Sequence, residues 1–317
     1  MATPKTPQPK RPDPRPVLVT GGAGFIGSHT VEALLAAGHC VRVLDNFSGG
    51  RAESLPEGHP QLDIMDGDAT RVADVQAAVR GCRQAIHLAA GSAEEPSPAA
   101  LAQANIVGFL TLREAAVAAQ LERVVYASSA AVYGRACERP CAESAPKVPC
   151  SPRGLEALVC EQYAAMLGAQ TRTRFAALRY FNVYGPRQAT RGPRAGVIGR
   201  WHERQQQGRA PLLHGDGEQS RDFIYVKDAA RATLAALYSP YQGAINVCTG
   251  RSTTLQELAD LFGRISGAAS AQYAPERDGD IRHVAGHNDR LKEVLQTPPV
   301  WSLEDGLTAM APRALAA

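Results

Sequence analysis

Short apolar runs alternate along the chain with segments whose apolar residues recur at helical spacing. The runs that predict β-strands cover residues 17–20, 40–44, 62–65, 84–88, 123–127, 175–180 and 244–248. The segments that predict helices cover residues 25–37, 72–79, 98–120, 154–167, 196–207, 225–237, 255–265 and 289–295. Apolar strands separated by helices are typical of a parallel sheet that is covered on both faces. The pattern therefore predicts an α/β fold with a doubly wound parallel sheet.

Three glycines, Gly21, Gly24 and Gly27, separate the first predicted strand from the first predicted helix. Gly21 can adopt the positive φ of a sharp turn, and Gly24 has no Cβ to keep a pyrophosphate from the backbone. Gly27 lets the helix pack close to the strand, and the free N–H groups at the helix start attract phosphate. This spacing and position are typical of the dinucleotide-binding turn of a Rossmann-like sheet. The alternative is a glycine-rich turn that binds no ligand.

Asp45 follows the second predicted strand directly. An acidic residue at this place hydrogen-bonds the adenosine ribose hydroxyls and repels a 2′-phosphate, so the pattern favours NAD over NADP. The alternative is a solvated surface carboxylate. Ligands of such sheets bind at the carboxyl ends of the strands. We therefore expect one edge of the sheet to carry Gly21, Asp45, Asp68, Ala89, Ser129 and Asn182.

The composition is that of an ordinary globular chain of 317 residues, 44% of them hydrophobic and 21% charged. A net charge of +3 is too small to indicate a nucleic-acid or membrane-surface partner. The chain has neither a membrane-spanning apolar run nor the apolar core of a signal peptide, which favours a cytoplasmic location. Its seven cysteines form no C-x-x-C pair, so we expect reduced thiols and no metal site.

The regular alternation covers only part of the chain. Residues 1–15 combine five prolines with lysine and arginine, which predicts a disordered tail. We expect a dinucleotide-binding domain over residues 16–185, to which residues 222–250 return. Residues 186–221, rich in Gly, Pro and Arg, and residues 251–317 are expected to form a smaller mixed α/β substrate domain.

Seven motifs carry a resemblance to a known family, and they lie at residues 20–27, 44–46, 87–90, 128–134, 179–187, 215–223 and 246–250. With them the chain resembles the extended short-chain dehydrogenase/reductase family, and in particular its NAD-dependent epimerase/dehydratase members. It is most similar to the 4-epimerases of UDP-glucose and UDP-N-acetylglucosamine. Dehydratases and decarboxylases of the family carry acidic residues where this chain has Ala130 and Ala131, which favours the epimerase branch.

The resemblance implies NAD as the cofactor, a UDP-sugar as the substrate, and a homodimer that pairs through helices 98–120 and 154–167. The implied cofactor-binding residues are Gly21, Gly24, Phe25, Ile26, Gly27, Asp45, Asn46, Ser48, Gly49, Asp68, Ala69, Leu88, Ala89, Ala90, Asn105, Ala127 and Tyr180. The implied substrate-binding residues are Asn182, Arg187, Val197, Leu212, Arg221 and Arg277. Arg194 and Asp278 depart from the Tyr and Pro that relatives often carry there.

The resemblance also implies a mechanism, from which this chain departs. In such epimerases NAD⁺ takes a hydride from C4, the keto-sugar rotates, and the hydride returns to the other face. Ser129 would hydrogen-bond the reacting hydroxyl, a Tyr would act as general base, and a Lys four residues later would lower its pKa and hold the nicotinamide ribose. Here the Tyr and Lys positions are Arg153 and Ala157. A guanidinium cannot accept a proton, and a methyl group cannot hold ribose hydroxyls.

Three hypotheses follow from that departure. The chain is an active UDP-sugar 4-epimerase in which Tyr184, Cys150 or Glu156 replaces the base. Alternatively, it is an impaired protein that binds NAD and a UDP-sugar without turning them over. In the third, it carries out redox or altered chemistry on an anionic sugar nucleotide, with Arg153 holding a carboxylate.

Overall fold

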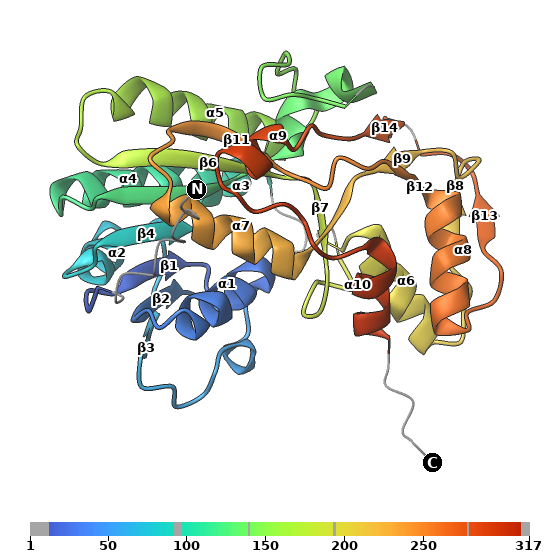
Figure 1. Ribbon diagram of the computed structural model, residues 1–317, viewed down its shortest axis with the longest axis horizontal. Helices are drawn as coiled ribbons and strands as arrows, with labels where there is room; N and C mark the ends of the chain where they lie inside the picture. Colours follow the sequence, from blue (N-terminus) through green and yellow to red (C-terminus); the bar gives the residue numbers. More distant parts are fainter. Residues whose placement is uncertain (1–12, 92–96, 139, 193–194, 278, 312–317) are drawn as a thin grey trace, which may run out of the picture.

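A parallel sheet forms the centre of the computed structural model, which describes residues 13–91, 97–138, 140–192, 195–277 and 279–311 (Figure 1). The strands of the sheet are β1 (Val17–Thr20), β2 (Val41–Asp45), β3 (Leu62–Asp66), β4 (Gln84–His87), β5 (Arg123–Ser129), β6 (Arg174–Tyr180) and β11 (Gly243–Val247). Within the described residues the sheet has seven strands in the order β11-β6-β5-β4-β1-β2-β3, and every pairing is parallel. The predicted Rossmann-like doubly wound sheet is confirmed.

Helices cover both faces of this sheet (Figure 1). One face carries α1 (Phe25–Ala36), α7 (Val226–Tyr238) and α9 (Asp289–Glu293). The other carries α2 (Val72–Val79), α4 (Gly108–Ala118) and α5 (Pro152–Gly168). Helix α7 buries Ala229, Ala232 and Ala236, which share a helix face and allow close approach to the sheet and to α1. The strands are therefore buried on both sides, as their near-continuous apolar sequence predicts.

The segment predicted as one helix over residues 98–120 is interrupted. It consists of α3 (Pro98–Ala102), a π-helical turn η2 (Gln103–Val107) and α4. Ser97 caps α3 by accepting a hydrogen bond from the Ala100 N–H. Asn105 lies in the π turn, where its amide oxygen accepts from Gly91 N at 2.8 Å and its amide nitrogen donates to Glu156 Oε2 at 2.6 Å. The side chain thereby joins the loop after β4 to α5, and spacing alone does not reveal such a turn.

A smaller lobe lies beside the sheet, at the right of Figure 1. Its elements are α6 (Val197–Gln206), β8 (Leu212–His214), β9 (Ser220–Arg221), β12 (Thr253–Thr254), α8 (Leu255–Ser266), β13 (Gln272–Ala274), β14 (His283–Val284) and α10 (Leu303–Met310). Trp201, Leu258 and Phe262 pack in its own core. Helix α8 begins with a capping box of Thr254 and Glu257. Periodicity did not predict α10, nor the short strands, whose two or three residues carry no periodic signal.

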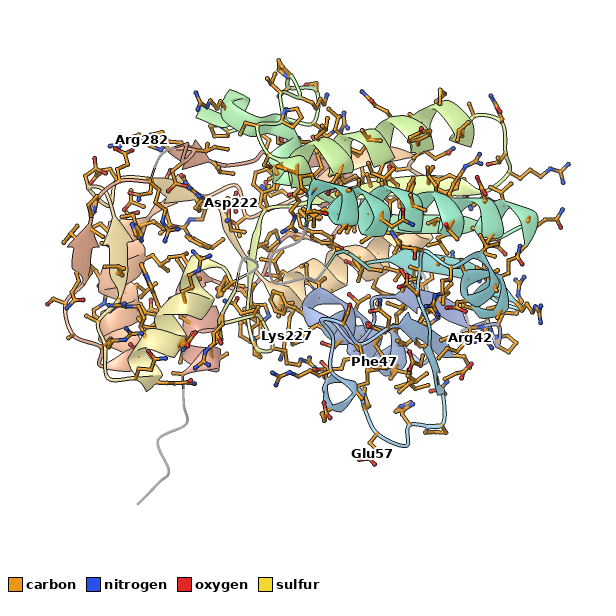
Figure 2. All side chains as sticks on the ribbon, turned by 180° about the vertical axis from the view of Figure 1, so that it is seen from behind. Arg42, Phe47, Glu57, Asp222, Lys227 and Arg282 are labelled. Carbon is orange, nitrogen blue, oxygen red and sulfur yellow. The ribbon has the colours of Figure 1, made fainter. Side chains whose placement is uncertain are left out.

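Two parallel strands, β7 (Asn182–Tyr184) and β10 (Phe223–Tyr225), link the lobes. Next to them, the fully buried carboxylate of Asp222 accepts hydrogen bonds from the N–H groups of Thr249 (2.8 Å) and Gly250 (2.9 Å). Figure 2 labels Asp222 at this junction. Among the described residues, no helix has both the length and the apolar character needed to cross a membrane. Residues 1–12 of the predicted tail, Arg194 and Asp278 lie outside the described residues.

Candidate cofactor and substrate site

The turn between β1 and α1 requires its glycines. Gly21 has φ +71°, and a Cβ there would lie 2.5 Å from the backbone nitrogen of Ala89, so the turn touches the loop after β4. A Cβ on Gly27 would lie 2.0 Å from the carbonyl oxygen of Gly21. Gly24 is the N-cap of α1 and makes no side-chain cap, so the first N–H groups of the helix have no side-chain acceptor there. A diphosphate fits such a helix start at the point where the strand order reverses.

Asp45 ties the end of β2 to the glycine turn. Its carboxylate accepts hydrogen bonds from the N–H groups of Ala23 and Phe47, both at 2.9 Å, and the residue is buried. At the end of β3, Asp68 accepts from Asn46 Nδ2 at 3.1 Å and from Thr70 N at 2.8 Å. Burial raises the pKa of Asp68, but the hydrogen bonds from Thr70 and Asn46 outweigh it and hold the pKa below its usual value. The Asp45 carboxylate beside the turn disfavours a 2′-phosphate, as predicted from the sequence.

The ends of β4 and β5 form an uncharged wall of small residues. Ala127 is exposed although it lies inside β5 between buried neighbours, and Ala89 and Ala90 follow β4. Beneath them, Thr20 Oγ1 and His87 Nδ1 lie 2.7 Å apart. Burial lowers the pKa of His87 to about 4, so this ring is neutral at pH 7. Small, uncharged side chains at these strand ends leave room for a planar ring such as the nicotinamide of NAD.

The remaining implied cofactor residues lie at the predicted edge of the sheet. They are partly or fully exposed: Phe25, Ile26, Asn46, Ser48, Gly49, Ala69 and Leu88. Tyr180 differs from them, because it is buried and its hydroxyl lies 2.6 Å from Thr233 Oγ1 on α7. Its hydroxyl therefore helps to hold α7 on the sheet. The roles of these residues toward a cofactor stay predictions.

The first turn of α5 lies against the segment that follows β5. Ser151 caps the helix by accepting from Gly154 N at 3.2 Å. A Cβ on Gly154 would lie 2.4 Å from the Ala131 carbonyl oxygen, so helix and segment are in contact. This brings together the elements that carry Ser129 and Arg153. Ser129 Oγ accepts from Ala131 N at 3.2 Å, Arg153 is exposed, and Ala157 is half-buried. At the two positions implied for base and lysine, the chain thus presents a guanidinium and a methyl group.

The candidate replacement bases are mostly engaged elsewhere. Tyr184 is buried in the smaller lobe, where its hydroxyl lies 3.3 Å from the Leu303 carbonyl, and burial raises its pKa well above the usual value. Both observations count against Tyr184 as the base. Glu156 is buried and directed at Asn105. Cys150 is exposed just before the Ser151 cap.

Below this turn, a polar network anchors α5 to the sheet. Arg179 on β6 pairs with Glu161 on α5 through two contacts of 2.8 and 2.6 Å. Ser128 Oγ donates to the same carboxylate at 2.5 Å, so Ser128 faces α5. Arg179 also donates to the Tyr133 hydroxyl at 2.8 Å. The network fixes the backbone on which Ser129 and Arg153 are carried. The sequence pattern did not predict this network, because each partner comes from a different helix or strand.

Two of the implied substrate arginines lie in the smaller lobe. Arg221 donates to the carbonyl oxygens of Ser220 (2.8 Å) and Arg282 (3.2 Å), and Asp280 is 3.9 Å away. Burial lowers the pKa of Arg221, while Asp280 acts in the opposite direction. Arg277 is exposed and borders a cavity of about 370 Å³. Asn182, at the start of β7, donates its backbone N–H to the Asp222 carbonyl at 3.1 Å. Val197 and Leu212 are half-buried at the starts of α6 and β8.

Arg187, one of the implied substrate residues, lies against α1. Its guanidinium donates to both carboxylate oxygens of Glu32 (2.8 and 2.7 Å) and to the carbonyl of Ser54 in η1 (Ala52–Ser54). It also lies 2.7 Å from His29 Nδ1. Arg187 therefore joins the loop after β7 to α1. Among the described residues, no group of three His, Cys, Asp or Glu side chains is arranged to hold a metal ion.

Comparison with known proteins agrees with this geometry. The model of the NAD dependent epimerase/dehydratase family matches residues 17–248. A putative UDP-glucose 4-epimerase of Methanocaldococcus jannaschii is 34% identical over 300 residues, covering 92% of this chain and 95% of that protein.

Two solved structures are similar over nearly the whole chain. A UDP-N-acetylglucosamine 4-epimerase of Methanobrevibacter ruminantium, in complex with UDP-N-acetylmuramic acid, has a TM-score of 0.88 and 36% identity, covering 93% of this chain and 96% of that one. A UDP-glucose 4-epimerase of Thermus thermophilus in complex with NAD has a TM-score of 0.84 and 34% identity, covering 92% and 96%. A family match over more than half of the chain, with relatives above 30% identity, makes this protein a member of the NAD-dependent epimerase/dehydratase family with NAD as its cofactor.

Proposed function

We propose that this protein binds NAD and a UDP-sugar in one crevice, and that 4-epimerisation of the sugar is strongly impaired. The observation that carries the proposal is the pair Arg153 and Ala157, on the first two turns of α5, where the Ser151 cap and the contact of Gly154 hold the backbone. Tyr184 and Glu156, two candidate replacements, are bonded elsewhere.

NAD supplies a hydride acceptor at the crevice when it is bound. Gly21, Gly24 and Gly27 would cradle its diphosphate, and Asp45 would hold the adenosine ribose. Arg221, Arg277 and Asn182 would hold the sugar nucleotide, as the UDP-sugar ligand of a similar epimerase suggests. Ser129 would orient the hydroxyl at C4. No side chain on the first turn of α5 can then take the proton, because Arg153 stays protonated.

The lack of a general base is expected to slow epimerisation strongly. Removing general-base catalysis typically costs about 10²- to 10⁴-fold in rate. Binding does not depend on that proton transfer, so affinity for NAD and UDP is expected to survive. Binding and turnover are therefore expected to separate in this protein.

Calorimetry and a turnover assay test the proposal together. Purified protein is titrated with NAD and with UDP, and is then incubated with UDP-glucose while UDP-galactose is followed by chromatography. We expect binding of both ligands and little conversion over hours. Rapid conversion would contradict the proposed impairment and would indicate that another group acts as the base. Cys150 is the candidate base that is exposed. A rise in NADH absorbance with net sugar oxidation would instead support redox chemistry. Failure to bind either ligand would remove the proposal altogether.

We also propose that residues 16–185 with 222–250 form the cofactor domain, and that 186–221 with 251–317 form the substrate domain. Separate apolar cores support this division. One apolar cluster lies on each face of the sheet. Another, in the smaller lobe, contains Trp201, Leu213 and Phe262. A cytoplasmic location is proposed on the sequence grounds given above, and the free thiols of Cys40, Cys82, Cys150 and Cys160 are consistent with it.

A homodimer through the α3–α4 segment and α5 is proposed on exposed apolar side chains. Val107, Leu155 and Met166 on these helices are 37%, 55% and 60% exposed. Light scattering after gel filtration would measure the mass. We expect a dimer that Met166→Glu weakens, and the control Val300→Glu, at a residue 63% exposed outside these helices, should leave the mass unchanged. A monomeric wild type would refute the dimer.

A further inference from the structure

The loop after β2, residues 46–54, lies against the glycine turn. Three of its residues are among those implied for cofactor binding: Asn46, Ser48 and Gly49. Farther along the loop, Arg51 donates its backbone N–H to the Ala23 carbonyl oxygen at 3.1 Å. Figure 2 labels Phe47 near the start of this loop. Because the adenosine of a dinucleotide lies beside the end of the second strand, the 46–54 loop borders the place expected for that adenosine.

The far end of the 46–54 loop is held by a side chain from outside it. Residues 51–53 are exposed, so their side chains contribute little packing. Ser54 closes the loop, and its carbonyl oxygen accepts a hydrogen bond from Arg187 Nη1 at 2.8 Å. Just beyond, Leu55 is buried in the apolar cluster that α1 covers. The end of the loop is therefore held by one buried side chain and by the guanidinium of Arg187.

Arg187 is itself anchored on α1. It donates to both carboxylate oxygens of Glu32, at 2.8 and 2.7 Å, and its Nη2 lies 2.7 Å from His29 Nδ1. His29 Nε2 lies 3.0 Å from the Pro186 carbonyl oxygen. A carbonyl only accepts, so this hydrogen-bond network assigns the proton to Nε2 and makes Nδ1 the acceptor for Arg187. Burial lowers the pKa of His29, which favours this neutral ring. The guanidinium thus joins α1 to the end of the loop.

The backbone that carries Arg187 is constrained from the smaller lobe. Arg187 has φ +68°, a left-handed conformation that residues other than glycine seldom adopt and that persists where surrounding contacts hold it. In the same segment, the Ala189 carbonyl oxygen would lie only 2.4 Å from a Cβ on Gly199 of α6. The segment 185–189 is therefore in contact with α6 on one side and with α1 on the other.

We propose that Arg187 is a positioning residue for the adenosine end of NAD. This rests on the NAD binding in the proposed function, and it differs from the substrate role that the resemblance implies. A loop that is already ordered spares the ligand the entropic cost of ordering it. By holding the end of the 46–54 loop, the guanidinium raises the affinity for ligands that contain ADP-ribose. UDP, which the proposed function assigns to Arg221 and Arg277, does not benefit.

Calorimetry on nucleotide-free protein with NAD, ADP-ribose and UDP tests the inference. Arg187→Ala should weaken NAD and ADP-ribose equally, by about ten-fold, because the loop must then be ordered on binding. UDP affinity should stay within about two-fold. Arg187→Lys keeps the charge without the planar fork and should lie between wild type and Arg187→Ala.

A further variant separates cofactor positioning from stability. Arg187→Gly removes the same guanidinium but suits the positive φ, so it should melt at a higher temperature than Arg187→Ala and still bind NAD as weakly. A purely structural role predicts instead that NAD affinity follows the melting temperature. The matched control is Arg191→Ala, at an exposed arginine that pairs with Glu203 of α6, and it should leave NAD affinity unchanged.

The outcomes distinguish the inference from the function on which it rests. NAD affinity within about two-fold of wild type in Arg187→Ala overturns the inference alone. An equal loss for UDP, or a loss for NAD without one for ADP-ribose, also overturns it, because the effect would then not act at the adenosine end. If Arg187→Ala fails to fold, Arg187→Gly decides by the same criteria. A wild type that binds no NAD overturns both the inference and the proposed function.

Discussion

The glycine turn after β1 and the first two turns of α5 differ in how far the fold itself dictates their residues. At the glycine turn, the backbone itself requires the glycines that the resemblance implies, because a Cβ on Gly21 or Gly27 would collide with backbone atoms. At α5, the backbone is equally constrained by the Ser151 cap and by Gly154. The positions that the resemblance implies for base and lysine, however, are an exposed Arg153 and a half-buried Ala157, whose identities the fold does not dictate.

That contrast separates two kinds of functional residue. Where a residue both folds the turn and binds the ligand, its replacement costs stability. Where a residue only does chemistry, its replacement leaves the fold unchanged and removes the activity. In the proposed function, this protein retains the first kind and lacks the second.

The largest expected effect comes from restoring the missing pair. Arg153→Tyr combined with Ala157→Lys should raise the rate of UDP-glucose conversion by about 10²- to 10⁴-fold, because a proton acceptor and the group that lowers its pKa are both supplied. Chromatography of UDP-glucose and UDP-galactose measures the rate. Each single variant serves as a control and should stay near the wild type. A double variant that folds and binds NAD but stays inactive would show that the rest of the site is also altered.

At the other wall, Gly27→Ala should weaken NAD binding by about 100-fold or more. The new Cβ would sit 2.0 Å from the Gly21 carbonyl oxygen, so the turn must open and the helix start must move away from the diphosphate. Calorimetry with NAD measures the loss. The matched control is Gly263→Ala in α8, where the nearest atom would be 3.6 Å from the new Cβ. Unchanged NAD affinity in Gly27→Ala would contradict the cradle.

The neutral His87 beneath the crevice makes stability depend on pH. Its pKa is about 4 in the folded protein and 6.5 as an ordinary value, so between these values the unfolded chain binds a proton that the native state does not. Stability contributed by the neutral ring is therefore complete above pH 6.5 and is lost as the pH falls toward 4. The loss is about 3 kcal/mol near pH 4.5.

Urea unfolding at pH 7.5 and 4.5 measures this effect on wild type and His87→Asn. The variant should lose about 3 kcal/mol less than wild type over that range. His287→Asn, at an exposed histidine, is the control and should behave as wild type. Identical pH dependence in wild type and His87→Asn would refute the role of His87.

The smallest expected effects distinguish two of the arginines that the resemblance implies for substrate binding. Arg277→Ala should weaken UDP binding by about ten-fold, since a charge-assisted hydrogen bond to phosphate is lost. Arg187→Ala should leave UDP affinity within about two-fold and lower the free energy of unfolding by about 1 kcal/mol, because Arg187 bonds α1 through Glu32. Calorimetry and thermal melts measure both. A large loss of UDP affinity in Arg187→Ala would restore the role expected from the sequence.

Local patterns were enough to predict the sheet and its binding edge. The apolar runs predicted all seven strands that the described sheet contains, and the glycine spacing predicted the turn at which their order reverses. The parallel sheet then places Asp45, Ala89 and Ser129 at the carboxyl ends of β2, β4 and β5, along one edge. These features depend on residues close together in the chain or on strand periodicity, which a single sequence displays.

The tertiary structure alone decided which side chains face one another. It joined Arg187 to Glu32, placed Tyr184 in the smaller lobe, engaged Glu156 with Asn105, and brought Arg135 to the same cavity as Arg277. Each pair comes from separate elements, and its geometry follows from how helices and loops pack, which leaves no periodic trace in the chain. The sequence by itself therefore determined the fold and the cofactor, whereas packing determined which polar groups from separate elements contact one another.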